Sequence, residues 1–343
     1  MEPSIYNTLW FMLVAVVLTG YAVLDGFDLG AGINLFLAGK TEHERELIQS
    51  AIGPVWNGNE VWLLAGGGGL VVSFPLLYAS AFSGFYIALT LVLWMLILRG
   101  VSLEFRHQVE SPGWRKTWDV VFCISSSLLA VLFGVAVANV VRGVPMGEGQ
   151  NFTAPLLFML NPYALVGGVF SLLMLGLHGA AYLAAKTEGA VQERARGLVR
   201  TLWWPVVLLA VVGAVYSHAV RPDWLVNYTA NVLLWVFPLI AAVSLINVFV
   251  ATRAERDKSA FAGTMGTIIG VLFSMGAGLY PKLLPALPGS TGGDLTIVNT
   301  AAPDTTQRLG LIIFCFGAVP LALYIWYVYK TWSGKVTGGF YHH

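Results

Sequence analysis

The sequence predicts an all-α integral membrane protein, and two observations support this fold class. Of the 343 residues, 57% are hydrophobic and only 11% are charged, whereas soluble domains are about a quarter charged. The chain also contains several mostly apolar runs of about 20 residues or more, the length that a helix needs to cross a bilayer core of about 30 Å. These runs outweigh the alternative that the length alone allows, which is two soluble domains.

Nine segments of membrane-spanning length follow one another along the chain. They lie near 6–37, 54–74, 76–105, 118–142, 156–185, 202–220, 229–251, 260–281 and 308–330. The second and third are expected to meet at a turn around Ser73-Phe74-Pro75. The longest connection, 282–307, is rich in Pro, Gly, Thr and Asp and is expected to be one exposed loop. We therefore expect a single transmembrane domain over residues 1–343.

The positions of Lys and Arg predict how the chain is oriented. Fifteen of the 19 basic residues fall on the connections after odd-numbered spans, on their flanks, or near the C-terminus. The other four are Arg142, Arg221, Lys282 and Arg308. Because Lys and Arg accumulate on the cytoplasmic side of membrane proteins, the N-terminus is expected outside and the C-terminus in the cytoplasm. Opposite sides for the two termini require an odd number of spans, which agrees with nine.

Several function classes find no support in the composition. A net charge of +1 without a Lys/Arg-rich run gives no indication of a nucleic-acid partner. Cys123 and Cys315 lie in apolar segments and are interpreted as packing residues. His178 lies alone in the fifth span, and a haem held by two side chains would need facing His–His or His–Met ligands. We therefore assign no catalytic, cofactor-binding or metal-binding residue to this chain.

Polar residues inside the predicted spans are the strongest functional signal, because a charge near the bilayer centre costs about 3 kcal/mol. The candidate group consists of Asp25, Asp28, Asn57, Glu60, Arg99 and Glu104. The first four form two pairs with a spacing of three residues, so each pair shares a helix face. At a rise of 1.5 Å per residue, the acids of spans one to three fall at a similar level toward the cytoplasmic side, together with Asp119 at the start of span four.

Two interpretations of this group stay open. The first is structural: the polar residues pair with Arg99, with Asn59 and with one another, and thereby fix helix packing. The second is a proton route, because Arg99 is the only cation expected to be buried among several carboxylates. An excess of carboxylates leaves some able to hold a proton near neutral pH. Glu60 is the acid that we would test first as a proton carrier.

Several strings resemble subunit II of cytochrome bd quinol oxidases, over nearly the whole chain and most densely before residue 185. They are GYAVLDGFDLG (20–30), PVWNGNEVW (54–62), AFSGFY (81–86), LRGVSLEFR (98–106), ANVVRGVP (138–145), LNPY (160–163) and HGAAYL (178–183). The chain departs from the family at Asn57, where relatives have Asp, and at Glu60, where they have Gln. Glu104 stands where some relatives have Asp. A shift of the acid by three residues keeps it on the same helix face, about 4.5 Å along the axis.

The resemblance implies two four-helix bundles, approximately 1–145 and 150–281, and a peripheral ninth helix at 308–332. It implies an obligate heterodimer with a haem-bearing subunit I, which holds two b-type haems, a third haem of d or b type, and the site that oxidises quinol. This chain would stabilise that subunit and carry protons from the cytoplasm for the reduction of O₂ to water. The expected location is a bacterial or archaeal plasma membrane, with lipid, quinone and small single-span accessory subunits as further partners.

Two rival functions remain at this point. A secondary transporter that couples protons to a solute also has acids inside its bundle, and its broken helices occur at matching positions in two halves. Only the first half of this chain is acidic within the membrane, which counts against a transporter. The other rival is a purely structural subunit whose acids carry no protons. Co-purification of a haem protein would exclude the transporter, and the kinetics of proton uptake would separate a proton path from a scaffold.

Overall fold

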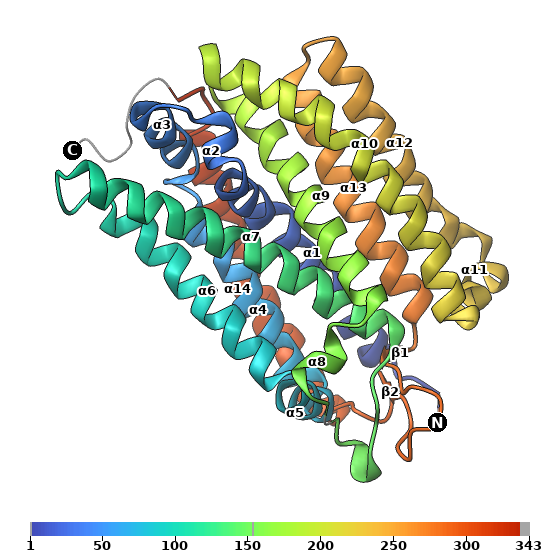
Figure 1. Ribbon diagram of the computed structural model, residues 1–343. Coiled ribbons are helices and arrows are strands. Elements are labelled where there is room, and N and C mark those ends of the chain that lie inside the picture. The colour runs from blue at the N-terminus through green and yellow to red at the C-terminus, as the bar shows by residue number, and fades with distance from the viewer. Residues whose placement is uncertain (1, 153, 337–343) are drawn as a thin grey trace.

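The structure is a computed structural model that describes residues 2–152 and 154–336, and it is a bundle of long helices. The first helix begins at one end of the bundle and the last helix ends at the other (Figure 1). We call these the N-terminal end and the C-terminal end of the bundle. Short helices, turns and two short strands connect the long helices at both ends.

Nine of the described helices have 18 or more residues. They are α1 (Ile5–Ile33), α4 (Trp56–Ser73), α6 (Tyr86–Phe105), α7 (Pro112–Arg142), α9 (Pro162–Lys186), α10 (Gly189–Val220), α12 (Val236–Arg253), α13 (Asp257–Leu279) and α14 (Asp304–Thr331). Within 2–152 and 154–336, eight of them are long and apolar enough to cross a membrane, which confirms a multi-pass membrane protein. The exception is α4, because Asn57, Asn59, Glu60 and several glycines lower its hydropathy. Nine spans and the predicted orientation therefore stay predictions.

The shorter elements lie at the ends of the long helices. They are the helices α2 (Leu35–Ala38), α3 (Glu42–Ile52), α5 (Pro75–Gly84), α8 (Leu156–Met159) and α11 (Val226–Ala230), the 3₁₀ turns Glu148–Gln150, Pro222–Leu225 and Val232–Trp235, and the strands β1 (Lys282–Leu284) and β2 (Leu295–Thr296). Two helices begin with clear capping signals. The Thr41 side chain accepts from the amide of Glu44 and the Glu44 side chain accepts from that of Thr41, which forms a capping box for α3. Asn161 caps α9, whose first residue is a proline.

The prediction of one continuous span over 76–105 is wrong. The segment forms two helices, α5 and α6, which meet at Phe85. Pro75 occupies the first turn of α5, where its missing N–H is tolerated. Phe85 is buried and packs edge-on against Phe152, with ring centroids 4.9 Å apart. This buried aromatic contact fixes the bend, and α5 lies across the N-terminal end of the bundle (Figure 1).

The connection 282–307 is also not one exposed loop. Its strands β1 and β2 pair antiparallel, and its apolar side chains close over the N-terminal end of the bundle. We call this layer the N-terminal cap. Its main buried members are Trp10, Phe74, Phe152, Leu284, Leu295 and Ile297. Two hydrogen bonds tie the first and last long helices together beside it: Trp10 Nε1 donates to the Gln307 carbonyl at 3.0 Å, and Gln307 Nε2 donates to Asn7 Oδ1 at 2.9 Å.

Helix α1 lies at the centre of the packing, against α4, α7, α9 and α13. Its closest approach is to α9, where Gly30 faces Gly179. A Cβ added to Gly30 would lie 2.6 Å from the Gly179 Cα atom, so neither position has room for a side chain. Small residues of this kind let membrane helices approach closely. Helix α9 also packs on α7, α10 and α13, and the division into two bundles at 1–145 and 150–281 stays a prediction.

Candidate functional site

The site begins with Asp25 on α1 and Arg99 on α6, two charged residues with almost no exposed surface. The Asp25 side chain is 0% exposed and that of Arg99 is 1% exposed, and Arg99 Nη1 lies 2.7 Å from Asp25 Oδ1. The second terminal nitrogen of Arg99 bonds Glu60 of α4, whose side chain is 28% exposed. One guanidinium thus joins carboxylates from two other helices. A planar guanidinium suits this role, because it presents donors in two directions at once.

Asp28 lies one turn further along α1 and has a different environment. Its side chain is buried, and Asp28 Oδ2 accepts a hydrogen bond of 2.7 Å from Asn59 Nδ2. The other carboxyl oxygen, Oδ1, has no hydrogen-bond partner among the described residues, and Asp28 forms no ion pair within residues 2–152 and 154–336. A buried carboxylate without a cation is costly in its charged form. Asp28 is therefore the acid of this group that is best placed to hold a proton.

Asn59 connects this group to the last helix. Besides Asp28, its amide nitrogen donates to the Leu24 carbonyl at 3.0 Å, and its oxygen accepts a hydrogen bond of 3.0 Å from the Tyr329 hydroxyl. The sequence offered no signal for Tyr329, which is separated from Asn59 by 270 residues. Asn57, which the sequence analysis selected, is exposed on α4 instead. The two asparagines are two residues apart, so they face different sides of one helix.

A second buried charge group lies nearer the C-terminal end of the bundle, around Asp119 of α7. Arg45 Nε is 2.8 Å from Asp119 Oδ2, and Arg106 Nε is 2.7 Å from Asp119 Oδ1. Gln49 Nε2 donates to the same Oδ1 at 2.7 Å. Arg106 is 1% exposed, so the expectation that Arg99 is the only buried cation is wrong. Arg106 follows directly after α6, and its side chain is nevertheless buried in the protein.

Four of the six predicted site residues come together in the structure: Asp25, Asp28, Glu60 and Arg99. Glu104 does not join them. It is exposed on α6, because five residues separate it from Arg99 and place it on another side of the helix. The contact between Glu60 and Arg99 also bears on the choice of Glu60 as the first acid to test, since Glu60 shares the charge of one guanidinium with Asp25.

Polar atoms without partners occur along α1 and its neighbours. Within the described residues, the buried side-chain atoms that lack a hydrogen bond include Asp28 Oδ1, Asn34 Oδ1, Ser126 Oγ and Gln49 Oε1. Ser126 of α7 lies against Gly32 of α1, about 6 Å along the helix axis from Asp28. Buried polar atoms without protein partners are where internal water is held. Gln49 bonds Asp119 at one end of this stretch, and Ser126 lies beside α1 about one turn from Asp28.

Comparison with known proteins shows which family the chain belongs to. The family model described as "Cytochrome bd terminal oxidase subunit II" matches residues 6–332. The chain belongs to this family. It is 30% identical to the Escherichia coli (strain K12) "Cytochrome bd-I ubiquinol oxidase subunit 2", covering 98% of this chain and 96% of that protein. It is 31% identical to the Bacillus subtilis (strain 168) "Cytochrome bd ubiquinol oxidase subunit 2", over 93% of this chain and 95% of that one.

The fold agrees with this membership. A chain of the bd oxidase from Geobacillus thermodenitrificans superposes with a TM-score of 0.79 at 18% identity, covering 96% of this chain and 98% of that chain. As a member of the subunit II family, the chain is a subunit of an oxidoreductase, and it is a multi-pass protein of the bacterial plasma membrane. The family resemblance inferred from the sequence is thereby confirmed.

His178 has partners of its own in this subunit II chain. Its ring is buried, with Nδ1 2.8 Å from Thr264 Oγ1 and Nε2 2.9 Å from the Val23 carbonyl. These contacts agree with the interpretation of His178 as a hydrogen-bonded packing residue. In the part of the chain that the structure describes, no three His, Cys, Asp or Glu side chains are grouped so that they could hold a metal ion.

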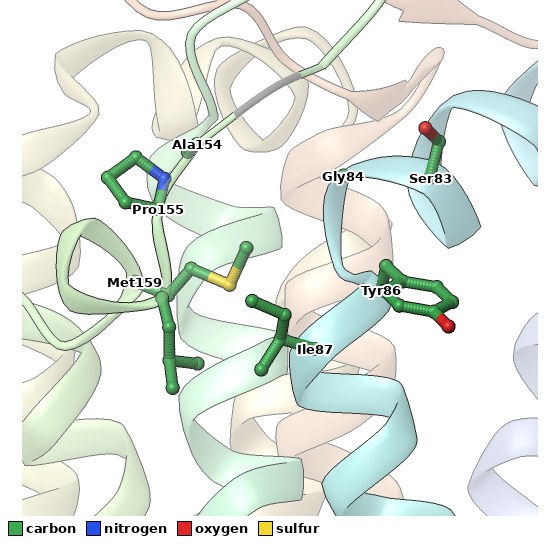
Figure 2. Close-up of a pocket in the computed structure, with 8 residues that line it drawn as sticks. Ser83, Gly84, Tyr86, Ile87, Ala154, Pro155 and Met159 are labelled. Atoms are coloured by element: carbon green, nitrogen blue, oxygen red, sulfur yellow. The ribbon is translucent and has the colours of Figure 1, made fainter.

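A cavity of about 390 Å³ lies apart from the charged groups, at the N-terminal end of the bundle. Figure 2 shows it between the junction of α5 with α6 and the segment that leads into α8. Its lining residues are Ser83, Gly84, Tyr86, Ile87, Ala154, Pro155, Leu156 and Met159. Among the described residues, this lining contains no carboxylate or basic group.

Proposed function

We propose that this chain is the subunit of a quinol:O₂ terminal oxidase that stabilises a haem-bearing subunit I and delivers protons to it. Membership of the subunit II family supports the assignment to the complex. The observation that carries the proton role is Asp28, a buried carboxyl group that has an amide partner and, among the described residues, one oxygen without a hydrogen bond and no paired cation. By the distribution of Lys and Arg, the C-terminal end of the bundle faces the cytoplasm.

The route would begin at the Asp119 group and continue along α1. Asp119 is held by Arg45 and Arg106, so it serves as a fixed charge that attracts water and not as a carrier. The unpartnered atoms of Gln49 and Ser126 would bind the water molecules that lead from there to Asp28. Water that bridges polar groups is as good a hydrogen-bond partner as a protein atom, so such a chain can conduct a proton.

From Asp28 the proton would reach the carboxylates that share Arg99. One guanidinium neutralises one of the two acids, Asp25 and Glu60, so the other favours binding a proton in this dry environment. Asp25 is enclosed, whereas Glu60 reaches the surface of α4. Glu60 would therefore be the exit, and Asp28 the internal carrier. In this route Asp28 and Glu60 therefore have different roles.

The surface of α4 would face subunit I. Asn57 is exposed there and Glu60 is partly exposed, and polar groups at membrane depth are rarely left facing lipid. Covering this edge with a partner protein removes that cost. Helix α14 packs beside it, with Tyr324 near Gly58. We therefore expect the partner to contact α4 together with the neighbouring faces of α6 and α14.

The proton role is tested with Asp28→Asn in the intact, purified complex. Asparagine keeps the shape and the partner Asn59 but cannot carry a proton, so oxygen consumption should fall about tenfold or more, as loss of a proton-transferring group does. Haem content and the reduction of haem by quinol should stay unchanged. Glu104→Gln is the matched control, because Glu104 is an exposed acid outside the group. An Asp28→Asn complex that consumes oxygen at the wild-type rate would make the group structural only.

Membership in the complex is tested separately. A tag on this chain should bring down a haem protein of the same membrane, with a visible spectrum that belongs to the partner. The chain expressed without that partner should give no reduced-minus-oxidised haem signal. A stoichiometric b-type signal from the isolated chain would instead assign a haem to it. The secondary transporter would be favoured if the chain alone were an abundant, stable monomer and moved a solute together with protons.

A further inference from the structure

Helices α10 and α12 present an apolar face that changes character at the C-terminal end of the bundle. Along most of their length the exposed side chains are aliphatic. They include Leu208, Val211, Val215, Leu239, Val243, Ile246 and Val250. Near the C-terminal end this face gives way to arginine and tryptophan, on α10 at Arg200, Trp203 and Trp204 and on α12 at Arg253. Tryptophan at such a boundary is typical of the membrane–water interface.

A small groove lies between the two helices at this boundary. Its volume is about 100 Å³, and its walls include Arg200, Trp204, Phe249, Thr252 and Arg253. Pockets for whole small molecules usually measure about 300–1,000 Å³. The groove is therefore too small for a complete metabolite, but it can receive a compact polar group whose remainder lies outside, along the apolar face.

The walls of the groove are held in place by aromatic contacts. Trp203 Nε1 donates to the Leu245 carbonyl at 2.8 Å, which joins α10 to α12. The Trp203 ring centroid lies 4.8 Å from that of Trp204 and 4.6 Å from that of Phe249. The Arg253 guanidinium carbon lies 4.0 Å from the Phe249 ring centroid, a cation–π contact. The arginine is therefore positioned by the ring beneath it and keeps its N–H donors available.

The two arginines of the groove are free of acids. Neighbouring Arg196 bonds the carboxylates of Glu193, Glu255 and Asp257. In contrast, neither Arg200 nor Arg253 forms an ion pair with any residue in 2–152 or 154–336, and both are exposed. Two uncompensated guanidinium groups on facing helices therefore carry a positive charge of two at the mouth of the groove.

We propose that this groove binds the headgroup of an anionic phospholipid, with the phosphate between Arg200 and Arg253 and the acyl chains on the aliphatic faces of α10 and α12. Guanidinium groups bind phosphate oxygens in a bidentate way. Basic pockets between membrane helices on the cytoplasmic side are suited to anionic headgroups. A headgroup with its own positive charge would place a third cation beside the two arginines, so phosphatidylglycerol is preferred over phosphatidylcholine.

The position of the groove argues for lipid over a protein partner. Helices α10 and α12 lie at the right of the bundle, whereas α4, α6 and α14 lie toward its lower left (Figure 1). The exposed polar edge at Asn57 and Glu60, which a partner subunit would have to cover, is thus on another side of the molecule. The exposed side chains on the face that leads to the groove are mainly aliphatic over several turns, the composition that lipid tails accept.

The proposal is tested on the intact complex in nanodiscs of phosphatidylcholine with a small fraction of phosphatidylglycerol. Retained lipid is counted by native mass spectrometry, and affinity is measured by titration with fluorescent phosphatidylglycerol. Arg200→Ala with Arg253→Ala should weaken binding about 30-fold, because each basic residue near an anionic membrane surface contributes about fivefold. The matched control is Lys116→Ala with Lys258→Ala, which removes two exposed cations from the same end of the bundle but outside the groove.

Each outcome decides the proposal. Loss of phosphatidylglycerol from the arginine variant and its retention in the lysine control support it. So does a partial loss with Arg200→Lys and Arg253→Lys, since lysine keeps the charge but not the bidentate geometry. Equal retention by the wild type and the arginine variant overturns it. Displacement of the lipid signal by millimolar inorganic phosphate, or equal affinity for phosphatidylcholine, also overturns it, by showing a general anion site or an unspecific lipid shell.

Discussion

Removing Arg99 should destabilise the protein far more than removing an exposed charge. Arg99→Gln keeps a polar side chain of similar reach but deletes the charge that holds Asp25 and Glu60 together. The Asp25 side chain is 0% exposed, so its carboxylate cannot turn to water. Breaking a buried ion pair by deleting one partner costs about 3–5 kcal/mol, because the remaining charge stays buried without compensation.

The structure also predicts which second change compensates for this loss. Without Arg99, the Asp25 carboxylate loses the guanidinium that neutralises it in its enclosed site. Adding Asp25→Asn should restore most of the lost stability at pH 7, because it removes the orphaned charge.

The assay is thermal unfolding of the purified complex in detergent, for Arg99→Gln, Asp25→Asn and the double variant. Comparing the three with the wild type isolates the energy of the pair. Arg308→Gln is the control, since Arg308 is an exposed cation of α14 and surface changes stay within about 0.5 kcal/mol. The reasoning fails if Arg99→Gln has the melting temperature of the wild type. It also fails if adding Asp25→Asn lowers the melting temperature of Arg99→Gln further instead of restoring it.

Two further predictions follow from packing and capping. Gly30→Ala should cost about 1–3 kcal/mol by overpacking against α9, whereas Gly213→Ala on α10, with open space around its Cβ position, should leave the melting temperature unchanged. Equal melting of the two variants would contradict the close contact of α1 and α9. Burial opposes the charged form of Glu44, but hydrogen bonds from Arg194 and from the amides of Thr41 and Lys40 outweigh it and lower the pKa of Glu44 from 4.5 to about 2. Because the pKa is lower in the folded protein, Glu44 stabilises above pH 4.5 and loses this effect as the pH falls toward 2. Glu44→Gln should thus melt earlier than the wild type at pH 7, with a difference that narrows below pH 4.5; a difference independent of pH would assign the effect to the capping hydrogen bonds alone.

The sequence was sufficient to find the acids on α1 and to name Arg99 and Asn59 as pairing candidates, but not the other partners. Asp25 and Asp28 stand out because they interrupt an apolar run, and their cost in a membrane calls for a reason. Tyr329 and Arg106 were missed, and Asn57 was chosen over Asn59 as a proton-path residue, for a shared physical reason. A membrane helix is apolar on all sides, so hydrophobic periodicity does not reveal which face turns inward. The choice between Asn57 and Asn59 is such a question of rotation, and only packing against α1 and α14 decides it.

The same reason explains the errors in the fold predicted from the sequence. Apolar content placed the long helices close to their observed positions, because length and hydropathy are properties of each segment alone. The break at Phe85 and the burial of Leu284 depend on contacts between segments, with Phe152 in the first case and with the N-terminal cap in the second. The run 76–105 is predicted as one continuous helix when only its own residues are considered.

The hydrogen bonds from Trp10 to Gln307 and from Gln307 to Asn7 have a consequence for biogenesis. Helix α1 enters the membrane first and α14 last, because synthesis proceeds from the N-terminus. Until α14 is inserted, the Trp10 indole N–H and the Asn7 side chain cannot form the hydrogen bonds that they have in the finished protein. The hydrogen bonds at the start of α1 therefore form only after α14 has been inserted. If synthesis stops before α14, the first helix of the nascent protein lacks these hydrogen bonds. The unpaired polar groups then distinguish the incomplete protein for quality-control proteases.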